Sequence, residues 1–332
     1  MERHQPAGID RLIEIFLTSL TALPLPWRTA PLGLCLSGGV DSSALAIAAS
    51  KALESAPEAF PQGVRAFHAR HGLRGSESSG DAASVRELCG RLGLALTEVD
   101  ASVPHGPGLE ARARAARYDA IRLAAGPATL LATAHHRDDQ TETVLLRLLR
   151  GAGPVGLRGI HPLRADGVWR PFLSVPRTSL AAMCEDCGWT PRQDSSNLDT
   201  AFARNALRHE FIPALEQEHP GVSEVLAALG DAAQRLEPYI ERALIRLSES
   251  VHLAVDDRGF SCDLSHLDDP ATDPELELLL DRVWTKFGRR PWAGQQRARL
   301  LSDAASGSTG RRAGGQGELA IWGSRKLRIE RA

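Results

Sequence analysis

Residues 32–50 of this chain read LGLCLSGGVDSSALAIAAS. The apolar run Leu32–Leu36 predicts a strand, the residues after it predict a tight loop, and the apolar run Ala44–Ala49 predicts a helix. A loop of this kind points backbone N–H groups and the positive end of the helix dipole at an anion. Gly38 and Gly39 carry no Cβ, so the main chain can come close to phosphate oxygens. The stretch therefore predicts a phosphate-binding loop.

The chemistry of this loop favours a nucleoside triphosphate with Mg²⁺. Its serine hydroxyls can donate to phosphate oxygens, and the carboxylate of Asp41 can hold a magnesium ion that bridges phosphates. A Walker A motif is excluded, because Val40 and Asp41 stand where that motif has Lys and Ser or Thr. The alternative is an ordinary Gly-Gly turn capped by serines, which the order of strand, loop and helix disfavours. The candidate nucleotide-binding residues are Ser37, Gly38, Gly39, Val40, Asp41, Ser42 and Ser43.

The run SGGVDS at Ser37–Ser42 resembles the pyrophosphate loop, or PP-loop, of the N-type ATP pyrophosphatases. Members of that family split ATP into AMP and pyrophosphate to adenylate an oxygen. The resemblance implies an α/β fold, a doubly wound parallel sheet of the adenine nucleotide alpha hydrolase type. The pattern of the chain predicts the same fold class, because strand-like segments at 64–68, 94–99 and 129–133 alternate with helix-like segments at 80–91, 109–124 and 139–150.

The pattern changes near His219-Pro220-Gly221. Before this point, residues 161–178 predict no regular element. Beyond it lie a long helical stretch to about Ser250, a short β-like segment, two more helical runs and a terminal alternation that suggests strands. We therefore predict a catalytic PP-loop domain at residues 1–219 and a smaller, mainly helical domain for substrate binding at 220–332.

Composition narrows the class of protein and its location. A chain of 332 residues with 43% hydrophobic and 24% charged residues is typical of a soluble globular protein. No apolar stretch reaches the ~20 residues needed to span a bilayer. Five cysteines, an odd number, fit reduced thiols better than a disulfide framework. The net charge of −2 does not by itself indicate a nucleic-acid partner, although arginines cluster at 112, 114 and 117. We expect a cytoplasmic protein without membrane contact.

A second polar cluster, TAHHRDDQTET at residues 133–143, follows the strand expected at 129–133. Its spacing places Asp139 and Glu142 on one helical face, where they can bind a cationic amine, orient it and accept a proton. The alternative interpretation of the cluster is a zinc site, but no His-x-x-x-His or cysteine spacing supports it. A helix N-cap at Asp138 or Asp139 explains the acidic residues but not the pair His135 and His136.

Three further segments complete a set of motifs. They are HARHGLR at 68–74, GLEARARAARY at 108–118, and DSSNLD at 194–199 followed by Arg204, Asn205 and Arg208. Together with SGGVDS, the HHRDDQTET run and the RGAG run at 150–153, they resemble the tRNA(Ile)-lysidine synthases. The motifs of that family occur here in order from Ser37 to Arg208, and the resemblance becomes loose beyond Gly221.

The resemblance implies a ligase that modifies tRNA. Members of the family use ATP to adenylate the C2 oxygen of the wobble cytidine of tRNA(Ile) with a CAU anticodon, and pyrophosphate leaves. The ε-amine of free L-lysine then attacks C2 and expels AMP. The product, lysidine, pairs with A instead of G, so that codon reading changes from AUG to AUA. The implied cofactors are ATP and Mg²⁺, and the implied partners are tRNA(Ile) and free L-lysine, with no iron–sulfur cluster and with a homodimer left open.

The resemblance also implies roles for single residues. Asp139, and after it Glu142, would hold the lysine amine and promote its deprotonation, since the ordinary pKa of that amine is about 10.4. Arg114 would face the adenylated base or the phosphate, or else form only a surface ion pair with Glu110. The implied catalytic residues are Asp41, which would also bind Mg²⁺, Arg114, His136, Asp139 and Glu142. The implied substrate-binding residues are His71, Glu110, Arg117, His135, Asp138, Asn197, Arg204 and Arg208.

Other functions also fit a PP-loop. A tRNA thiolation enzyme would hold an iron–sulfur cluster on cysteines, and Cys184-x-x-Cys187 is the feature in its favour. A small-molecule ligase of the NAD or GMP synthetase type is disfavoured by the arginine-rich segment 110–118 and by the separate C-terminal domain. An ATP-binding protein that has lost catalysis is disfavoured by the acidic residues at 139 and 142.

Overall fold

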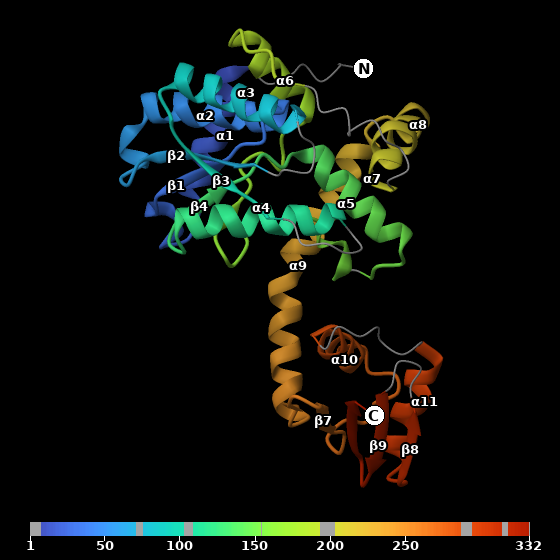
Figure 1. Ribbon diagram of the computed structural model, residues 1–332. Helices are drawn as coiled ribbons and strands as arrows, with labels where there is room; N and C mark the ends of the chain where they lie inside the picture. The colour runs from blue at the N-terminus through green and yellow to red at the C-terminus, as the bar shows by residue number, and fades with distance from the viewer. Residues whose placement is uncertain are drawn as a thin grey trace. The chain divides into compact units, whose positions relative to one another are not determined.

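The chain forms two compact units in a computed structural model (Figure 1). The first unit is Met1–Gln234 and the second is Arg235–Ala332. In the described part of the chain, no helix has both the length and the apolar character needed to cross a membrane. The structure describes residues 8–70, 76–102, 109–153, 155–192, 203–286, 294–313 and 318–331.

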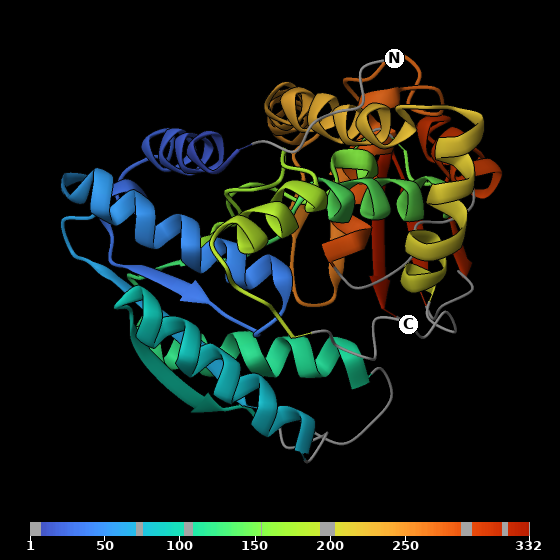
Figure 2. The ribbon, with the colours of Figure 1, turned by 90° about the horizontal axis from the view of Figure 1, so that it is seen from above.

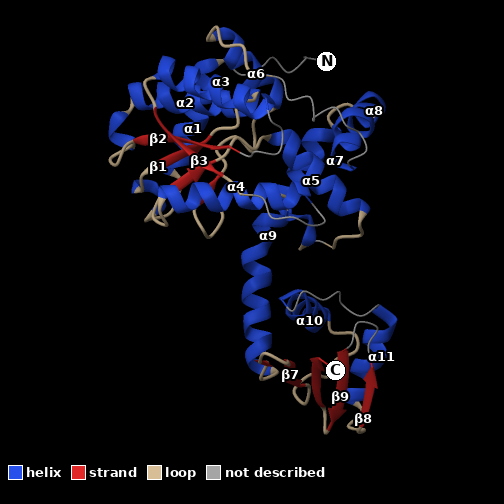
Figure 3. Ribbon diagram, viewed as in Figure 1, coloured by secondary structure: helices blue, strands red, loops and turns tan. Residues whose placement is uncertain are grey.

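A five-stranded parallel sheet forms the centre of the first unit (Figure 3). Its strand order is β3-β2-β1-β4-β5, and Leu32 of β1 is in register with Val64 of β2 on one side and with Leu130 of β4 on the other. The winding direction therefore reverses between β1 and β4, and ligands of such sheets bind beyond the carboxyl ends of the strands at this point. The strands are β1 (Leu32–Cys35), β2 (Val64–Arg70), β3 (Ala95–Asp100), β4 (Leu130–Ala132) and β5 (Val168–Trp169).

Helices cover both faces of the sheet, which confirms the expected doubly wound fold (Figure 1). On one face, Phe16, Leu45 and Leu180 belong to the main apolar core, and on the other face Ile121 packs with Phe67. The view from above shows that α2 lies along β1 and runs back toward the start of that strand (Figure 2). The helices on the first face are α1 (Ile9–Thr21), α2 (Val40–Ser55), α3 (Ser76–Leu92) and α6 (Arg177–Asp186), and the helix on the second is α4 (Leu109–Ala125).

The remaining helices of the first unit gather beside the carboxyl end of β4 (Figure 1). The Thr141 hydroxyl on α5 donates to the Ser223 carbonyl of α9 at 3.0 Å, and Arg137 forms an ion pair with Glu224 at 2.9 Å. These contacts fix the start of α9 against the helix that follows β4. The elements are α5 (Arg137–Leu149), α7 (Ala203–Ala206), a π-helical turn at Leu207–Phe211, α8 (Ile212–Glu218) and α9 (Val222–Ser250).

The second unit confirms the expected smaller domain, and it contains an antiparallel sheet of order β6-β7-β10-β9-β8 as well as helices (Figure 3). Its apolar core includes Phe260, Trp284, Leu300 and Leu327. The boundary between the two units, after Gln234, falls within the residue range of α9. The further elements are β6 (Ala254–Val255), β7 (Gly259–Asp263), α10 (Pro274–Lys286), α11 (Gly294–Ala305), β8 (Gly310–Ala313), β9 (Glu318–Gly323) and β10 (Lys326–Arg331).

Candidate active site

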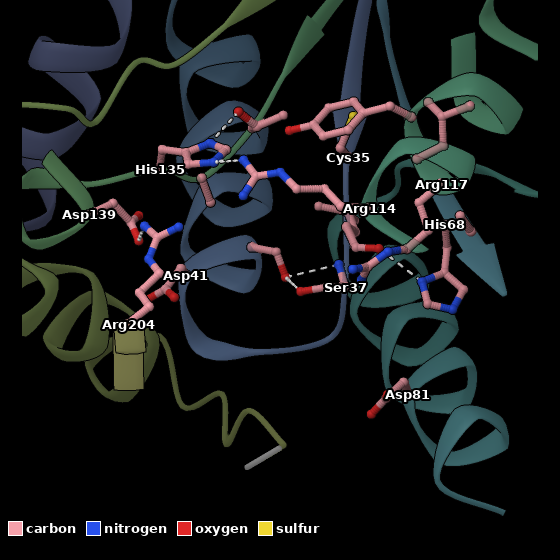
Figure 4. A pocket seen from close by; sticks show the side chains of 17 residues that line it. Cys35, Ser37, Asp41, His68, Asp81, Arg114, Arg117, His135, Asp139 and Arg204 are labelled. Atoms are coloured by element: carbon pink, nitrogen blue, oxygen red, sulfur yellow. Dashed lines mark hydrogen bonds and ion pairs between the residues drawn. The ribbon is translucent and has the colours of Figure 1, made fainter. Parts of the chain in front are cut away.

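A cavity of about 320 Å³ lies at the carboxyl ends of β1, β2 and β4, where the winding of the sheet reverses (Figure 4). Ser37 and Asp41 line it from the phosphate loop, and His135 and Asp139 line it from the junction of β4 and α5. Arg114 reaches it from α4. The two polar clusters that the sequence singled out therefore open on the same cavity.

The phosphate loop has the backbone that its glycines permit. Gly38 has φ of +91°, and a Cβ at this position would lie 3.3 Å from the Asp81 carbonyl oxygen. A side chain here would be both strained and crowded. The loop therefore passes close to Asp81 of α3.

The start of α2 is open to an anion. Gly39 is the N-cap of this helix and caps it with no side-chain hydrogen bond. Ser42 Oγ lies 3.1 Å from Ser37 N and 3.1 Å from Ser37 Oγ, and it donates to the Gly39 carbonyl. Ser43 Oγ is buried and has no hydrogen-bond partner among the described residues. A helix start without a side-chain cap, with its dipole directed at the cavity edge, fits the negative oxygens of a polyphosphate.

Asp41 on the first turn of α2 is held by two cationic groups from other elements. Its Oδ1 accepts from Arg177 Nε at 3.1 Å, and its Oδ2 lies 3.7 Å from His136 Nε2. Burial works to raise the pKa of Asp41, but the interactions with His136 and Arg177 outweigh it and bring this pKa below its ordinary value. The carboxylate is therefore ionised, as an oxygen ligand of Mg²⁺ must be. Among the described residues, no group of three or more His, Cys, Asp or Glu side chains could hold a metal alone.

The start of α5 is closed by its own carboxylate. Asp139 Oδ2 accepts from the backbone N–H of His136, the N-cap residue, at 3.0 Å. The His136 ring is 1% exposed and lies within 4 Å of Asp41, Asp138 and Asp139. Burial opposes the imidazolium, but these three carboxylates outweigh it and raise the pKa of His136. His136 therefore joins the two clusters electrostatically beneath the cavity.

Two arginines from the segment after α6 bind the carboxylates of α5. Arg204 donates from Nε to Glu142 at 2.6 Å and from Nη2 to Asp139 at 3.0 Å. Arg208 makes the same pair of contacts, at 2.5 Å to Glu142 and 3.2 Å to Asp139. Glu142 is 2% exposed, so both of its oxygens are used inside the protein, whereas Asp139 also lines the cavity.

Figure 4 shows His135 on the same side of the cavity as Asp139, with the Arg114 guanidinium reaching toward the His135 ring. Arg114 Nη2 lies 2.6 Å from His135 Nε2, and His135 Nδ1 lies 2.8 Å from Thr133 Oγ1. Burial, and then the charges of Arg114, Arg170 and Arg204, lower the pKa of His135 to about 3. Neighbouring histidines thus differ in character: His135 is neutral, and His136 is biased toward its charged form.

The sequence-predicted residues fall into three groups. Ser37, Asp41, Ser42, Arg114, Arg117, His135, Asp139 and Arg204 line the cavity. The other described candidates do not line it: Gly38, Gly39, Val40 and Ser43 belong to the loop before α2 and its first turn, and His136, Asp138, Glu142 and Arg208 pack behind the lining residues through the contacts given above. His71 and Asn197 lie outside the described residues, as does the side chain of Glu110 at the start of α4.

The structure adds residues that sequence reasoning missed. Arg177, the first residue of α6, holds Asp41, and nothing in its surrounding sequence signals this contact. His68 Nδ1 donates to the Leu36 carbonyl oxygen at 2.9 Å, and His68 lines the cavity together with Asp81 of α3. His68 begins the HARHGLR segment, so the motif itself was a usable signal.

Residues 14–215 match the model of the PP-loop domain family. The chain belongs to the PP-loop family. Membership of this ATP-binding family implies that the protein uses ATP. The segment Ser37–Ser43 lies within the matched residues and leads into α2 at the edge of the cavity.

This PP-loop protein is similar to curated tRNA(Ile)-lysidine synthases. It is 41% identical over 236 residues to that of Bordetella bronchiseptica, which covers 67% of this chain and 64% of the relative. It is 40% identical over 218 residues to that of Xanthomonas campestris pv. campestris, with 62% and 48% covered. It is 43% identical over 194 residues to that of Symbiobacterium thermophilum, with 55% and 39% covered. The chain therefore spans less than two-thirds of the length of these relatives.

A solved structure supports the fold of this PP-loop protein. The U34-tRNA thiolase NcsA from Methanococcus maripaludis, with its 4Fe-4S cluster, is similar with a TM-score of 0.50 and 18% sequence identity. The likeness covers 69% of this chain and 79% of the thiolase. At this identity it shows a common fold and nothing of the ligands.

Proposed function

We propose that this PP-loop protein is a tRNA(Ile)-lysidine synthase. In the first step, the C2 oxygen of the wobble cytidine of CAU-bearing tRNA(Ile) attacks the α-phosphorus of ATP, and pyrophosphate leaves. In the second, the ε-amine of free L-lysine attacks C2, the C2–O bond breaks, AMP leaves and the amine loses a proton. The observation that carries this proposal is one cavity that contains both a phosphate loop and an acidic, arginine-bound helix start.

The loop side of the cavity suits the first step. The amides at the start of α2 and the hydroxyls of Ser37, Ser42 and Ser43 bind the triphosphate. Asp41 would hold Mg²⁺, and a bound ion would supply positive charge beside the phosphates. Arg114 points into the cavity and stabilises negative charge on the reacting phosphate or base.

The α5 side suits the second step. Asp139 is ionised and lines the cavity, so it binds and orients the lysine ammonium. A carboxyl whose pKa is about 2 is a weak base, and for this reason orientation rather than proton removal is the role we assign to it. Glu142 does not line the cavity and acts by holding Arg204 and Arg208 in place. His136 neutralises Asp41 and Asp139 from behind.

The tRNA is held by groups that surround this cavity. Arg117 and Arg204 line it, and Arg208 lies beside Asp139, so that cationic groups meet the anticodon backbone. The bases of an anticodon loop are already partly unstacked, so exposing cytidine costs little. The family motifs assign substrate binding to His71, Glu110 and Asn197. We assign tRNA binding to residues 220–332, and we place the reaction in the cytoplasm.

The test is incubation of the full chain with ATP, labelled lysine and CAU-bearing tRNA(Ile). We expect label in the tRNA together with equimolar AMP and pyrophosphate. The CAU-bearing methionine tRNA is the matched control and should acquire none. Pyrophosphate exchange that needs no RNA would favour a small-molecule ligase instead. Iron in anaerobically purified protein would favour thiolation.

A further inference from the structure

A chain of hydrogen bonds connects Thr133 through His135 to Arg114. The guanidinium donates from Nη2 to His135 Nε2 at 2.6 Å, and His135 Nδ1 lies 2.8 Å from Thr133 Oγ1. The Thr133 hydroxyl in turn donates to the Trp169 carbonyl oxygen at 3.5 Å. Thr133 follows β4 directly, is 5% exposed and lines the cavity.

The valences of these groups fix the direction of each bond. Arg114 lies 2.6 Å from His135 Nε2 and can only donate, so Nε2 accepts, and the proton of the neutral ring is on Nδ1, which donates to Thr133 Oγ1 at 2.8 Å. A neutral imidazole protonated on Nδ1 carries a lone pair on Nε2. That lone pair is what Arg114 requires, because a guanidinium has only donors.

We propose that Thr133 is a positioning residue that sets the tautomer of His135 and thereby fixes Arg114 in the cavity. Without the Thr133 acceptor, the imidazole proton can move to Nε2, and two N–H groups would then face each other between His135 and Arg114. The guanidinium would lose its anchor and turn away. The proposed function gives this arrangement its purpose, since Arg114 stabilises charge only where it points at the reacting groups.

Two further observations agree with this arrangement. Burial and the surrounding arginines lower the pKa of His135 to about 3, so the ring is neutral at physiological pH and its Nε2 can accept. The Arg114 guanidinium also lies 5.9 Å from the Tyr118 ring centroid, which supports it from a second side. His135 and Tyr118 together hold one orientation of the guanidinium.

The direct test is the tautomer of His135 in the unliganded full chain. Long-range ¹H–¹⁵N correlation on ¹⁵N-histidine protein distinguishes the two neutral tautomers, and the His135→Gln variant assigns the signals. We expect the Nδ1–H form at pH 7 in the wild type and a substantial Nε2–H population in Thr133→Val. An Nε2–H or charged ring in the wild type would overturn the proposal without involving any activity.

The kinetic test uses three variants. Thr133→Val removes the hydroxyl and should lower the rate of pyrophosphate release about 10- to 100-fold with little change in the KM for ATP. Thr133→Ser keeps the hydroxyl and should restore most of that rate. Thr129→Val is the matched control, because the Thr129 hydroxyl donates to the Ala125 carbonyl at the other end of β4. It should alter neither the tautomer nor the rate.

The outcomes separate this proposal from the proposed function. Equal loss in Thr133→Val and Thr133→Ser, or an unchanged tautomer in Thr133→Val, would overturn the role of the hydroxyl while lysidine formation by the wild type still stands. Failure of the wild type to form lysidine, with the expected tautomers observed, would overturn the function and leave the positioning of Arg114 intact.

Discussion

Two strand-to-helix junctions meet at the cavity, and they have opposite electrostatic characters. Between β1 and α2, glycine leaves the first amides of the helix without a side-chain cap. Between β4 and α5, Asp139 accepts from the amide of the N-cap residue and, with Glu142, binds two arginines. The same backbone geometry therefore offers a site for an anion at one junction and for a cation at the other. The side chains at the helix start decide whether the junction suits an anion or a cation.

The largest effect should come from the junction between β1 and α2, which we call the open junction because its helix start has no side-chain cap. Asp41→Ala removes the proposed ligand of Mg²⁺, and we expect pyrophosphate release from ATP to fall about 10³-fold. Release of labelled pyrophosphate in the presence of tRNA measures it. Asp10→Ala removes a carboxylate from the first turn of α1, outside the cavity lining, and serves as the control. A normal rate in Asp41→Ala would mean that this junction does not act on the triphosphate.

We call the junction between β4 and α5 the capped junction. There, Asp139→Ala should stop the second step, lysine transfer, and leave the first step, adenylation, intact. We expect lysine transfer to fall about 100-fold, because the ammonium loses the carboxylate that orients it. Adenylated tRNA should then accumulate, which gel analysis of tRNA labelled from α-³²P-ATP detects. Asp139→Asn, of the same size, controls for loss of packing. If adenylation falls as much as in Asp41→Ala, the two junctions do not divide the reaction between them.

Removing a cation from the capped junction should cost stability. Arg208→Met leaves one oxygen of Glu142, which is 2% exposed, without its partner, and we expect a loss of about 2 to 3 kcal/mol in unfolding free energy. Chemical denaturation measures it. Arg11→Met breaks an exposed ion pair with Glu14 and should change stability by less than about 0.5 kcal/mol. Equal effects of the two variants would show that the buried pair has no special role.

The capped junction should also be sensitive to acid. Burial works to raise the pKa of Asp139, but the charges of His136 and Arg204 outweigh it and lower this pKa to about 2. An unfolded Asp titrates near 3.9, so this carboxylate stabilises the folded chain above about pH 4 by on the order of 2 kcal/mol. The contribution is lost as the pH falls toward 2. The difference in unfolding free energy between wild type and Asp139→Asn should shrink over that range, and a constant difference would contradict the assignment.

The smallest effect should come from the spare hydroxyl of the open junction. Ser43 Oγ is buried without a partner among the described residues, so Ser43→Ala should leave unfolding free energy within about 0.5 kcal/mol. The KM for ATP should rise about fivefold, as for the loss of one hydrogen bond. Ser42→Ala is the contrast, since the Ser42 hydroxyl bonds within the loop and its loss should also lower stability. An unchanged KM in Ser43→Ala would remove this hydroxyl from the nucleotide site.

Much of the fold follows from local sequence patterns. The apolar run at Leu32, the glycines at 38 and 39 and the alternation that follows correctly predicted the parallel sheet and its flanking helices. The sequence did not predict β5, because a strand of two residues is too short to show an alternating pattern of apolar and polar residues. Of the sheet of the second unit, the sequence predicted the segment that forms β7 and the terminal strands, but neither β6 nor β8, which are short.

The sequence by itself determined which segments form the two junctions and which side chains stand there, because glycine freedom, helix capping and hydrophobic period act over a few residues. Only the tertiary structure decided the partners. Arg177 meets Asp41 across 136 residues of sequence, and Arg204 meets Glu142 across 62. Residues so far apart in sequence come into contact only when the strands align in register. The folded sheet therefore decides which carboxylate faces the cavity and which one binds only arginines.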